Sequence, residues 1–483
     1  MSTQQADPPV RFDGDGPGDV RDLEVRNASG PAIAEAEFTG PPAGADRPAG
    51  YRDVFAVREF RGVFAADLFS LIGDQIAAVA VAVLLYQDSG SPLLAAAGYA
   101  TAYVPWLLGG PLLAAWAERF AGRSVMVGCD LARAALMGLA VLPGLPTLGV
   151  AGLVFLAAML APPFDAARSA LLAQILTGNR YPVGMSLRQA VHQIAQLCGF
   201  ALGGALVLAL SAPGVLALNC LTFLASALLL RTFLVRRPAP GGPADADRPE
   251  KPRPSPVVPG QRPSDEARTR PGPKPARTSI WQDMIAGARV VRRDQRIWFP
   301  LLLGIVGASY AIVPEAIATA YAAELGHGSS AVGLIMAAAA AGSVVGGLAI
   351  GRFAGPSAAA RLMYPLALAG TLPLLVIALR PGLLISLALF VLCGLGQAFQ
   401  VVANTQFAGH VPAPVRTRAF GIAIAGLYGG QSLAILMAGA AAQWLAPSTV
   451  IAGSGLVGAV GVVLLPRLRP GVLQARGRHA HQR

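Results

Sequence analysis

Long apolar segments dominate this sequence and restrict its fold more than any other feature. A helix of about 20 apolar residues is long enough to cross the hydrocarbon core of a bilayer. Twelve segments reach roughly that length, at about 62–86, 93–117, 124–143, 147–175, 185–210, 214–235, 297–323, 331–353, 358–379, 382–408, 418–444 and 448–466. The pattern predicts an all-α membrane protein with twelve transmembrane helices.

The composition agrees with a chain that is solvated largely by lipid. Hydrophobic residues make up 54% of the sequence and charged residues only 13%, whereas soluble proteins usually contain about 25% charged residues. The net charge is +12, but the arginines fall mostly in short gaps between apolar segments, so we expect no nucleic-acid partner. The four cysteines lie inside apolar segments without a CxxC pair. We interpret them as packing residues and expect no metal and no cofactor.

Polar stretches divide the chain into predicted domains. Residues 1–55 are rich in Pro, Gly, Asp and Glu and predict a disordered cytoplasmic tail. The stretch 236–280 contains twelve prolines and predicts a flexible cytoplasmic linker. We therefore expect a six-helix bundle over 56–235, and an interfacial amphipathic helix followed by a second bundle over 281–470. Residues 471–483 would form a second cytoplasmic tail.

The distribution of arginine predicts the orientation in the membrane. The first, third, fifth, seventh and eleventh gaps between apolar segments contain no Arg or Lys, and only the ninth gap, with Arg380, breaks this pattern. The even-numbered gaps are all basic. Because positively charged loops stay in the cytoplasm, we expect a multi-pass protein of the cell membrane with both termini in the cytoplasm.

An internal repeat indicates two related halves. The sequence Arg-Phe-Ala-Gly occurs at 119–122, after the second apolar segment, and again at 352–355, after the eighth. The equivalent position in each half favours duplication. Parallel repeats of this kind predict two six-helix bundles related by an axis along the membrane normal.

Five short patterns follow one another in the order expected for one transporter family. They are SLIGDQ at 70–75, the residues Gly110, Pro111, Glu118, Arg119 and Arg123 around the second gap, FDAAR at 164–168, GFALGG at 199–204, and VPAPVRTR at 411–418. Together they resemble the major facilitator superfamily and, within it, the bacterial drug and siderophore exporters. The sequence departs from the family patterns at Ala114, Glu118 and Phe200, where the family has Gly, Asp and Pro.

The resemblance implies a function. It implies a secondary transporter that exports a hydrophobic or amphipathic small molecule by alternating access, as an antiporter driven by protons, with a role in efflux or multidrug resistance. Its partners would be the substrate, protons and the lipid bilayer, and the protein would be a monomer. No P-loop pattern is present in the sequence, so transport should use a gradient and not ATP.

Acidic residues inside apolar segments are candidates for proton coupling, because charge in hydrocarbon is costly. Asp74 lies near the middle of the first segment and is the leading candidate; the alternative is a structural role next to Ser70. Asp67 and Glu315 are the other two candidates. We favour a structural role for Asp67, which lies nearer the cytoplasmic end.

A second set of charged residues predicts a cytoplasmic latch. Asp130 and Arg133, and likewise Asp165 and Arg168, have the i, i+3 spacing of an intrahelical ion pair. With the loop residues Glu118, Arg119 and Arg123 they would form one network that holds a single conformational state.

Polar and aromatic residues are candidates for the substrate cavity, although interhelical hydrogen bonds and packing are the alternatives. The candidates are His192, Gln196, Tyr103, Tyr310, Gln397 and Gln400. Gly199, Gly203 and Gly204 are candidates for close helix packing.

Two other functions remain possible from the sequence. One is an uptake permease of the same fold for a polar nutrient. The other is a membrane scaffold that transports nothing. An enzyme is not expected, because the sequence has no nucleophile–base pair or metal-ligand cluster of recognised spacing.

Overall fold

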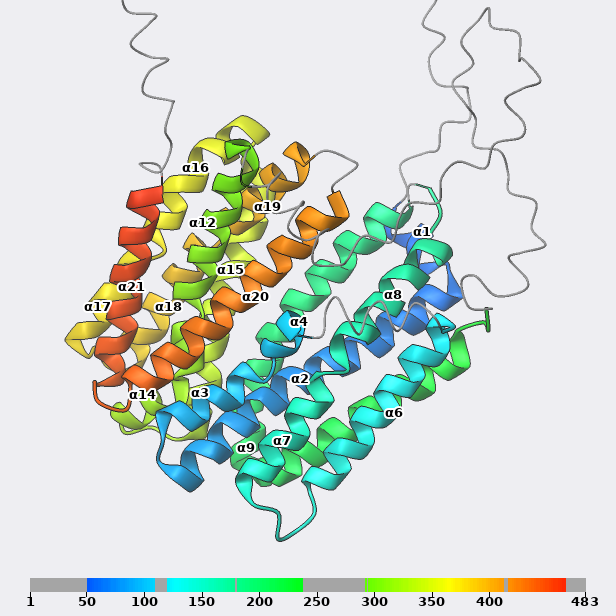
Figure 1. Cartoon of the computed structure of the whole chain (residues 1–483), viewed down its shortest axis with the longest axis horizontal. Coiled ribbons are helices and arrows are strands. Elements are labelled where there is room, and N and C mark those ends of the chain that lie inside the picture. Colours follow the sequence, from blue (N-terminus) through cyan, green and yellow to red (C-terminus); the bar gives the residue numbers. More distant parts are fainter. Residues whose placement is uncertain are drawn as a thin grey trace, which may run out of the picture. The chain divides into compact units, whose positions relative to one another are not determined.

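The regular structure in the computed structural model is helical (Figure 1). The structure describes residues 50–108, 120–178, 180–237, 292, 294–411 and 416–465. These described residues contain no strand. In the first half the helices are α1 (Tyr51–Phe55), α2 (Arg58–Ser89), α3 (Pro92–Ala100), α4 (Val104–Leu108), α6 (Gly122–Ala140), α7 (Thr147–Ala158), α8 (Ala161–Ile175) and α9 (Arg180–Phe233). In the second half they are α12 (Gln295–Ala311), α13 (Val313–Ala316), α14 (Ala318–Glu324), α15 (Ser329–Phe353), α16 (Pro356–Ala369), α17 (Leu372–Val376), the short 3₁₀ helix η2 (Ile377–Leu379), α18 (Leu383–Gly396), α19 (Phe399–His410), α20 (Arg416–Ala441) and α21 (Pro447–Leu464). The all-α prediction is confirmed.

Within the described residues, every predicted apolar segment consists mainly of helix. Several segments are made of consecutive short helices, and at three of the junctions the next helix has proline in its first turn. Pro162 and Pro163 occupy the first turn of α8, Pro314 that of α13 and Pro373 that of α17. Proline is tolerated there because the first amides of a helix have no partner within it.

The long helix α9 contains two predicted segments. Ser211 leaves the helical conformation, with φ 61° and ψ 167°, and Pro213 follows it. The break coincides with the predicted uncharged gap at 211–214. The chain therefore turns inside α9, and the helix supplies two membrane crossings.

Nine helical stretches of the described residues are long and apolar enough to span a membrane. One of them, Val183–Phe233, contains the break at Ser211 and so counts twice. Helix α6 contains three charged residues, Arg123, Asp130 and Arg133, and the second apolar segment is described only as far as Leu108. The described residues thus supply ten apolar crossings, and the rest of the second predicted segment lies outside them.

Large apolar side chains on the outside of the bundle indicate contact with lipid. Leu208 is 73% exposed, Leu384 82% and Trp444 84%. In water such a surface would favour association or precipitation. In a bilayer the same side chains are solvated by hydrocarbon, as expected for a membrane protein.

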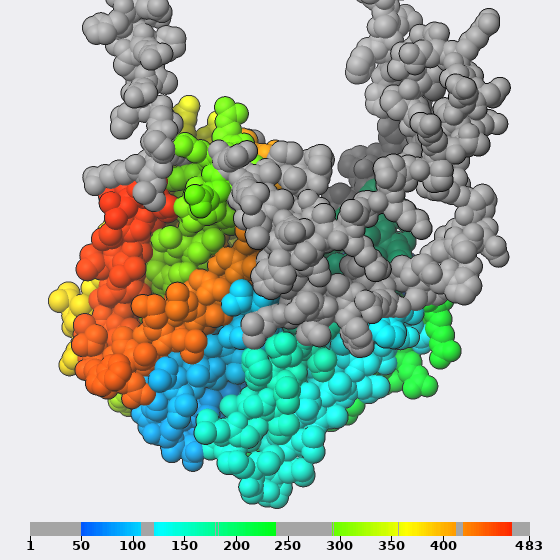
Figure 2. Space-filling view, in the orientation of Figure 1, coloured from blue at the N-terminus to red at the C-terminus, as the bar shows by residue number. Residues whose placement is uncertain are grey.

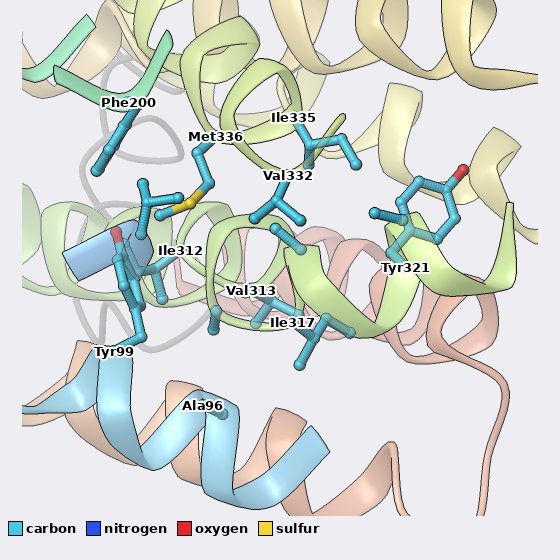
Figure 3. Close-up of a cluster of buried hydrophobic side chains, with 14 of the residues drawn as sticks. Ala96, Tyr99, Phe200, Ile312, Val313, Ile317, Tyr321, Val332, Ile335 and Met336 are labelled. Atoms are coloured by element: carbon cyan, nitrogen blue, oxygen red, sulfur yellow. The ribbon is translucent and has the colours of Figure 1, made fainter. Parts of the chain in front are cut away.

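The two halves pack directly on each other. Helix α9 of the first half contacts α15 of the second, and α3 contacts α20; in Figure 2 the orange α20 lies along the blue α3. The largest buried cluster includes residues of both halves, among them Tyr99, Phe200, Tyr321 and Ile335 (Figure 3). These helices therefore form the boundary at which the halves could separate.

Some predicted regions lie outside the described residues. They are residues 1–49 of the predicted tail, almost all of the predicted linker and interfacial helix, and the chain beyond residue 465. Within the predicted tail, helix α1 is described, and its Val54 is fully buried. Packed structure thus begins slightly before the predicted boundary at residue 55.

Candidate functional site

Asp74, Asp130 and Arg133 form a three-charge cluster in the middle of the first half. Arg133 Nη1 lies 3.9 Å from Asp74 Oδ2 and 3.9 Å from Asp130 Oδ1. Asp130 is fully buried, and its Oδ2 accepts a hydrogen bond of 2.5 Å from the Ser226 hydroxyl. Arg133 also donates weakly, at 3.3 Å, to the carbonyl oxygen of Ala157. Two helices, α2 and α6, therefore bring together residues that are far apart in the sequence.

The three-charge cluster is not electrically balanced. It contains two carboxylates and one guanidinium, and the nearest carboxylate–guanidinium distances of 3.9 Å exceed a normal hydrogen bond. Buried Asp130 Oδ1 has no hydrogen-bond partner. An excess negative charge is costly in a low-dielectric interior. One proton on either carboxyl group would make the cluster neutral.

A four-charge cluster lies nearer the predicted cytoplasmic end of the same half. Arg168 forms close ion pairs with both Asp67 and Asp165. Arg188 of α9 donates a hydrogen bond of 2.8 Å to Asp165 and lies 3.8 Å from Asp67. Here two carboxylates face two guanidinium groups. The four-charge cluster is therefore neutral without any added proton.

The predicted single latch network is not what the described residues form. Both intrahelical pairs, Asp130–Arg133 and Asp165–Arg168, are present as predicted. They belong, however, to two separate clusters at different depths. Arg123 joins neither, because its guanidinium donates to the carbonyl oxygen of Arg231 at the end of α9, at 2.5 Å. Glu118 and Arg119 lie outside the described residues.

Glu315 connects the two halves. Its Oε2 accepts a hydrogen bond of 2.6 Å from the hydroxyl of Tyr99, and both side chains are buried. Figure 3 shows Tyr99 projecting from α3 toward Ile312, which lies three residues before Glu315 in the sequence. The Tyr103 hydroxyl is 3.0 Å from that of Tyr99. We call Tyr99, Tyr103 and Glu315 the interhalf cluster.

Aromatic rings continue from the interhalf cluster. The ring of Tyr428, on α20, has its centre 6.0 Å from that of Tyr103. The indole of Trp106 stacks on the Tyr428 ring with centres 5.3 Å apart and an interplanar angle of 12°. All three side chains are partly exposed. Together Tyr103, Trp106 and Tyr428 form an aromatic wall with members from both halves.

The remaining cavity candidates separate into two groups. His192 and Gln196 are partly exposed on α9, and His192 lies within electrostatic range of Arg188. In the second half, Gln400 donates to Gln397 at 2.7 Å, and the amide nitrogen of buried Gln397 has no partner. These positions remain candidates for contact with a ligand.

Tyr310 takes the packing role that the sequence left open as the alternative to ligand contact. Its hydroxyl donates to the carbonyl oxygen of Ala367 at 2.9 Å, and the side chain is buried. Its ring lies against the backbone of Gly458 on α21. Tyr310 thus packs within the second half and does not join the aromatic wall.

The three predicted packing glycines lie at close helix contacts. A Cβ atom at Gly199 would lie 2.5 Å from Cβ of Gln75, and one at Gly203 would lie 3.0 Å from Cγ2 of Val79. Both residues therefore face α2. Gly204 instead faces α15 of the second half, where a Cβ would lie 2.6 Å from the carbonyl oxygen of Ser329.

Contacts between the halves gather at the end of the molecule that the arginine pattern predicts to be outside. Gly204 meets α15 near its first turn, and Gly439 of α20 meets Ala96 of α3, where a Cβ would lie 2.6 Å from that of Ala96. Gln443 also donates to Ser91 at 2.5 Å. The α14 and α3 segments lie at the same end in Figure 1. The halves are closed against each other there.

Sequence reasoning missed three residues of these clusters. Arg188, beside the basic fourth gap, was not among the predicted site residues, whereas it neutralises the four-charge cluster. Tyr99 and Tyr428 lie in apolar segments and look like packing residues. The i, i+4 spacing of Tyr99 and Tyr103 was the one available signal, since it places both rings on one helix face.

Comparison with known proteins gives a consistent family. The model of the family described as Major Facilitator Superfamily matches residues 63–408. Among solved structures, a variant of the nucleoside transporter NupG has a TM-score of 0.63 at 13% identity, covering 85% of this chain and 99% of that one. A bacterial homologue of the human lysosomal transporter Spinster, in an inward-facing and occupied conformation, has a TM-score of 0.61 at 13% identity, covering 87% and 98%. A POT family transporter in complex with 5-aminolevulinic acid has a TM-score of 0.62 at 12% identity, covering 88% and 99%. No curated protein sequence matches significantly.

Proposed function

The chain belongs to the major facilitator superfamily, and from that premise we propose that it exports a hydrophobic or amphipathic small molecule in exchange for protons. It is a secondary transporter with this family's fold, and alternating access is the mechanism we assign to it. The cell membrane is the proposed location, with both termini in the cytoplasm. The solved transporters that it resembles share its fold, at identities too low to assign a substrate.

The unbalanced three-charge cluster is the observation that carries the proposal of proton coupling. A coupling site needs a group whose charge changes as the protein alternates between two states. The cluster of Asp74, Asp130 and Arg133 is neutral only when one carboxyl group holds a proton. Loss of that proton leaves a negative charge among apolar helices, and this change in charge can shift the balance between conformations.

Asp74 is the carboxyl group of the cluster that is best placed to exchange the proton. Its side chain is 43% exposed, whereas Asp130 is fully buried and hydrogen-bonded to Ser226. Asp74 is also held loosely, because its nearest guanidinium nitrogen is 3.9 Å away. By contrast, Asp67 is bound closely by Arg168 in a neutral cluster. We therefore assign coupling to Asp74 and a structural role to Asp67.

Closed contacts at one end support an inward-open resting state. The two halves meet at Gly204, Gly439 and the Ser91–Gln443 hydrogen bond, which the arginine pattern assigns to the outer face. Export then requires these contacts to open after substrate enters from the cytoplasm. Proton binding from outside would return the empty protein to the inward-open state.

Reconstitution of the whole protein tests this function. Purified protein would be incorporated in vesicles that contain a pH-sensitive dye, and a panel of amphipathic compounds would be added under an imposed pH gradient. We expect at least one compound to move against its gradient while protons move the other way. Compound movement in the same direction as protons would instead indicate an uptake permease. Movement of neither would leave the scaffold function as the better explanation.

A further inference from the structure

An apolar groove lies between α3 and α7, at the end of the first half that the arginine pattern predicts to be outside. Its volume is about 260 Å³. Both helices lie on the face shown in Figure 2, α3 in blue and α7 in teal. Among the residues that line the groove are Leu94, Ala97 and Thr101 of α3 and Leu148, Gly152 and Phe155 of α7.

The lining of the groove is almost entirely apolar. Among the described residues that line it, Thr101 has the one polar side chain, and its hydroxyl already donates to the carbonyl oxygen of Gly98 at 2.6 Å. A Cβ atom added at Gly152 would meet nothing within 4 Å. Water gains no polar partner in such a groove, and an empty groove loses dispersion contacts along its walls. The groove therefore favours an apolar occupant.

The size and the surroundings of the groove point to a lipid chain. Pockets that enclose a whole drug-sized ligand usually hold about 300–1,000 Å³, whereas this groove is smaller and open along one side. Leu148 in its lining is 64% exposed, and Leu156, one turn beyond Gly152 on α7, is 53% exposed. Exposed leucines of a membrane helix contact lipid, so acyl chains of the bilayer lie at the opening of the groove.

A carboxylate without a cation lies at the outer mouth of the groove. Asp88 follows Leu85 by one turn of α2, and Leu85 also lines the groove. The hydroxyl of Thr147, next to Leu148 on α7, donates to Asp88. Asp88 is exposed, and no ion pair between described residues includes it. A carboxylate at the level of the lipid headgroups attracts a cation and forms its strongest hydrogen bonds with a charged donor such as an ammonium.

We infer that the groove binds one acyl chain of a phospholipid whose headgroup carries a primary ammonium, as in phosphatidylethanolamine, and that Asp88 binds this ammonium. The chain lies between α3 and α7, and the headgroup lies beside Asp88 in the outer leaflet. The site is separate from the charge clusters inside the bundle. It therefore depends neither on proton coupling nor on export.

The bound lipid contacts a helix that also helps to close the outer end. Ala97 of α3 lines the groove, while its neighbour Ala96 meets Gly439 of α20. A chain in the groove adds apolar contacts to α3 and α7. Because the groove exists only in the folded protein, occupation by lipid should raise the temperature of unfolding.

Three phospholipids with identical palmitoyl and oleoyl chains test the inference. The ammonium of phosphatidylethanolamine can donate hydrogen bonds, phosphatidylcholine has the same charges without an N–H donor, and phosphatidylglycerol has a net negative charge. The purified full chain in detergent would be mixed with equal amounts of the three, and native mass spectrometry would measure the first lipid bound. We expect phosphatidylethanolamine to bind at least about fivefold better than phosphatidylglycerol, which corresponds to ~1 kcal/mol at 25 °C. Phosphatidylcholine should lie between them.

Matched variants locate the chain and the headgroup separately. Gly152→Leu fills the groove and should weaken binding of all three lipids at least about fivefold. Its control is Gly128→Leu on α6, where an added Cβ also meets nothing within 4 Å, and this variant should bind like the parent. Asp88→Asn should keep chain binding and lose the preference for phosphatidylethanolamine. Asp53→Asn, which changes an exposed carboxylate at the other end of the first half, should keep that preference.

Thermal unfolding of each variant would show that it is folded, so that lost binding can be assigned to the site. Equal binding of the three lipids to the parent, or an unchanged preference in Asp88→Asn, would overturn the inference. Binding to Gly152→Leu at the level of the parent would do the same. A dimer of the parent that Gly152→Leu dissociates would assign the groove to a second copy of the chain and would also contradict a lipid site. Proton-driven export is measured in vesicles and is independent of each of these outcomes.

Discussion

Arg380 and Glu324 form an ion pair, with Arg380 Nε 3.1 Å from Glu324 Oε1. Arg380 is the one basic residue in a gap that the arginine pattern places outside the membrane. Glu324 follows the seventh apolar segment, in a gap that the same pattern also places outside. The pair therefore holds the seventh and ninth gaps together at one end of the second half.

The same carboxylate should matter more for stability than its arginine partner. Glu324 also accepts hydrogen bonds from the amide of Ser448, at 2.8 Å, and from its hydroxyl, at 2.7 Å, in the first turn of α21. We expect Glu324→Gln to cost about 1–3 kcal/mol of stability and Arg380→Gln less than about 1 kcal/mol, because Arg380 is 62% exposed. Thermal unfolding, followed by labelling of the four cysteines as they become exposed, would measure both. Equal losses would contradict this ranking.

Asp74→Asn should keep the fold and remove proton coupling. Asparagine has nearly the same shape as aspartate. The loosely held carboxyl group is replaced by an amide, which cannot exchange a proton. Substrate binding should persist, while transport driven by a pH gradient in vesicles should fall to the background. Transport like that of the parent between about pH 6 and 8 would place coupling elsewhere.

Asp67→Asn is the matched comparison and should behave in the opposite way. It removes one of two carboxylates that hold Arg168 and Arg188, so that two guanidinium groups share one remaining carboxylate. We expect a loss of about 3 kcal/mol or more in stability and a lower yield of folded protein. The protein that does fold should still couple transport to protons.

Charge balance in the three-charge cluster predicts that two substitutions will not add. Either Asp74→Asn or Asp130→Asn leaves one carboxylate and one guanidinium, which is a neutral pair. The double variant leaves buried Arg133 with no carboxylate beside it. We expect small losses for each single variant and about 3 kcal/mol or more beyond their sum for the double variant. Additive losses in thermal unfolding would show that the cluster does not act as a charge-balanced unit.

Gly204→Leu should open the outer end. Even a Cβ at this position would lie 2.6 Å from the carbonyl oxygen of Ser329 and 2.8 Å from the amide nitrogen of Gly333, so α9 and α15 must move apart. Spin labels in place of Ser91 and Gln443, which are hydrogen-bonded in the closed state, would report a longer mean distance.

Gly453→Leu is the control for this experiment, because nothing lies near an added Cβ at Gly453. Its label distance should equal that of the parent. If Gly204→Leu also leaves the distance unchanged, the contact between α9 and α15 does not close the outer end.

Much of the fold could be predicted from the sequence. The length of the apolar segments decides that helices cross a bilayer, since backbone amides in hydrocarbon must bond within their own helix. Pro213 and the uncharged gap around it marked the turn within α9. Both intrahelical pairs, Asp130–Arg133 and Asp165–Arg168, followed from helical spacing alone.

The assignment of charges to clusters needed the tertiary structure. Helical periodicity shows which residues share a face, but not which helix packs against that face. Asp74 shares the guanidinium of Arg133 with another carboxylate, at a long distance, whereas Asp67 lies between two arginines. Only the packing of α2 against its neighbours produces this difference. The sequence therefore identified the acidic residues in the membrane, and the tertiary structure decided which of them has a balanced partner.

The sequence by itself determined a helical membrane protein and predicts its orientation, because lipid imposes these properties on each segment separately. The tertiary structure alone decided that Tyr99 and Glu315, which are 216 residues apart, share a hydrogen bond. It also decided that Gly204 faces the second half while Gly203 faces α2. Contacts of this kind depend on how two bundles meet, and that geometry arises from the packing of many side chains together and not from any local pattern.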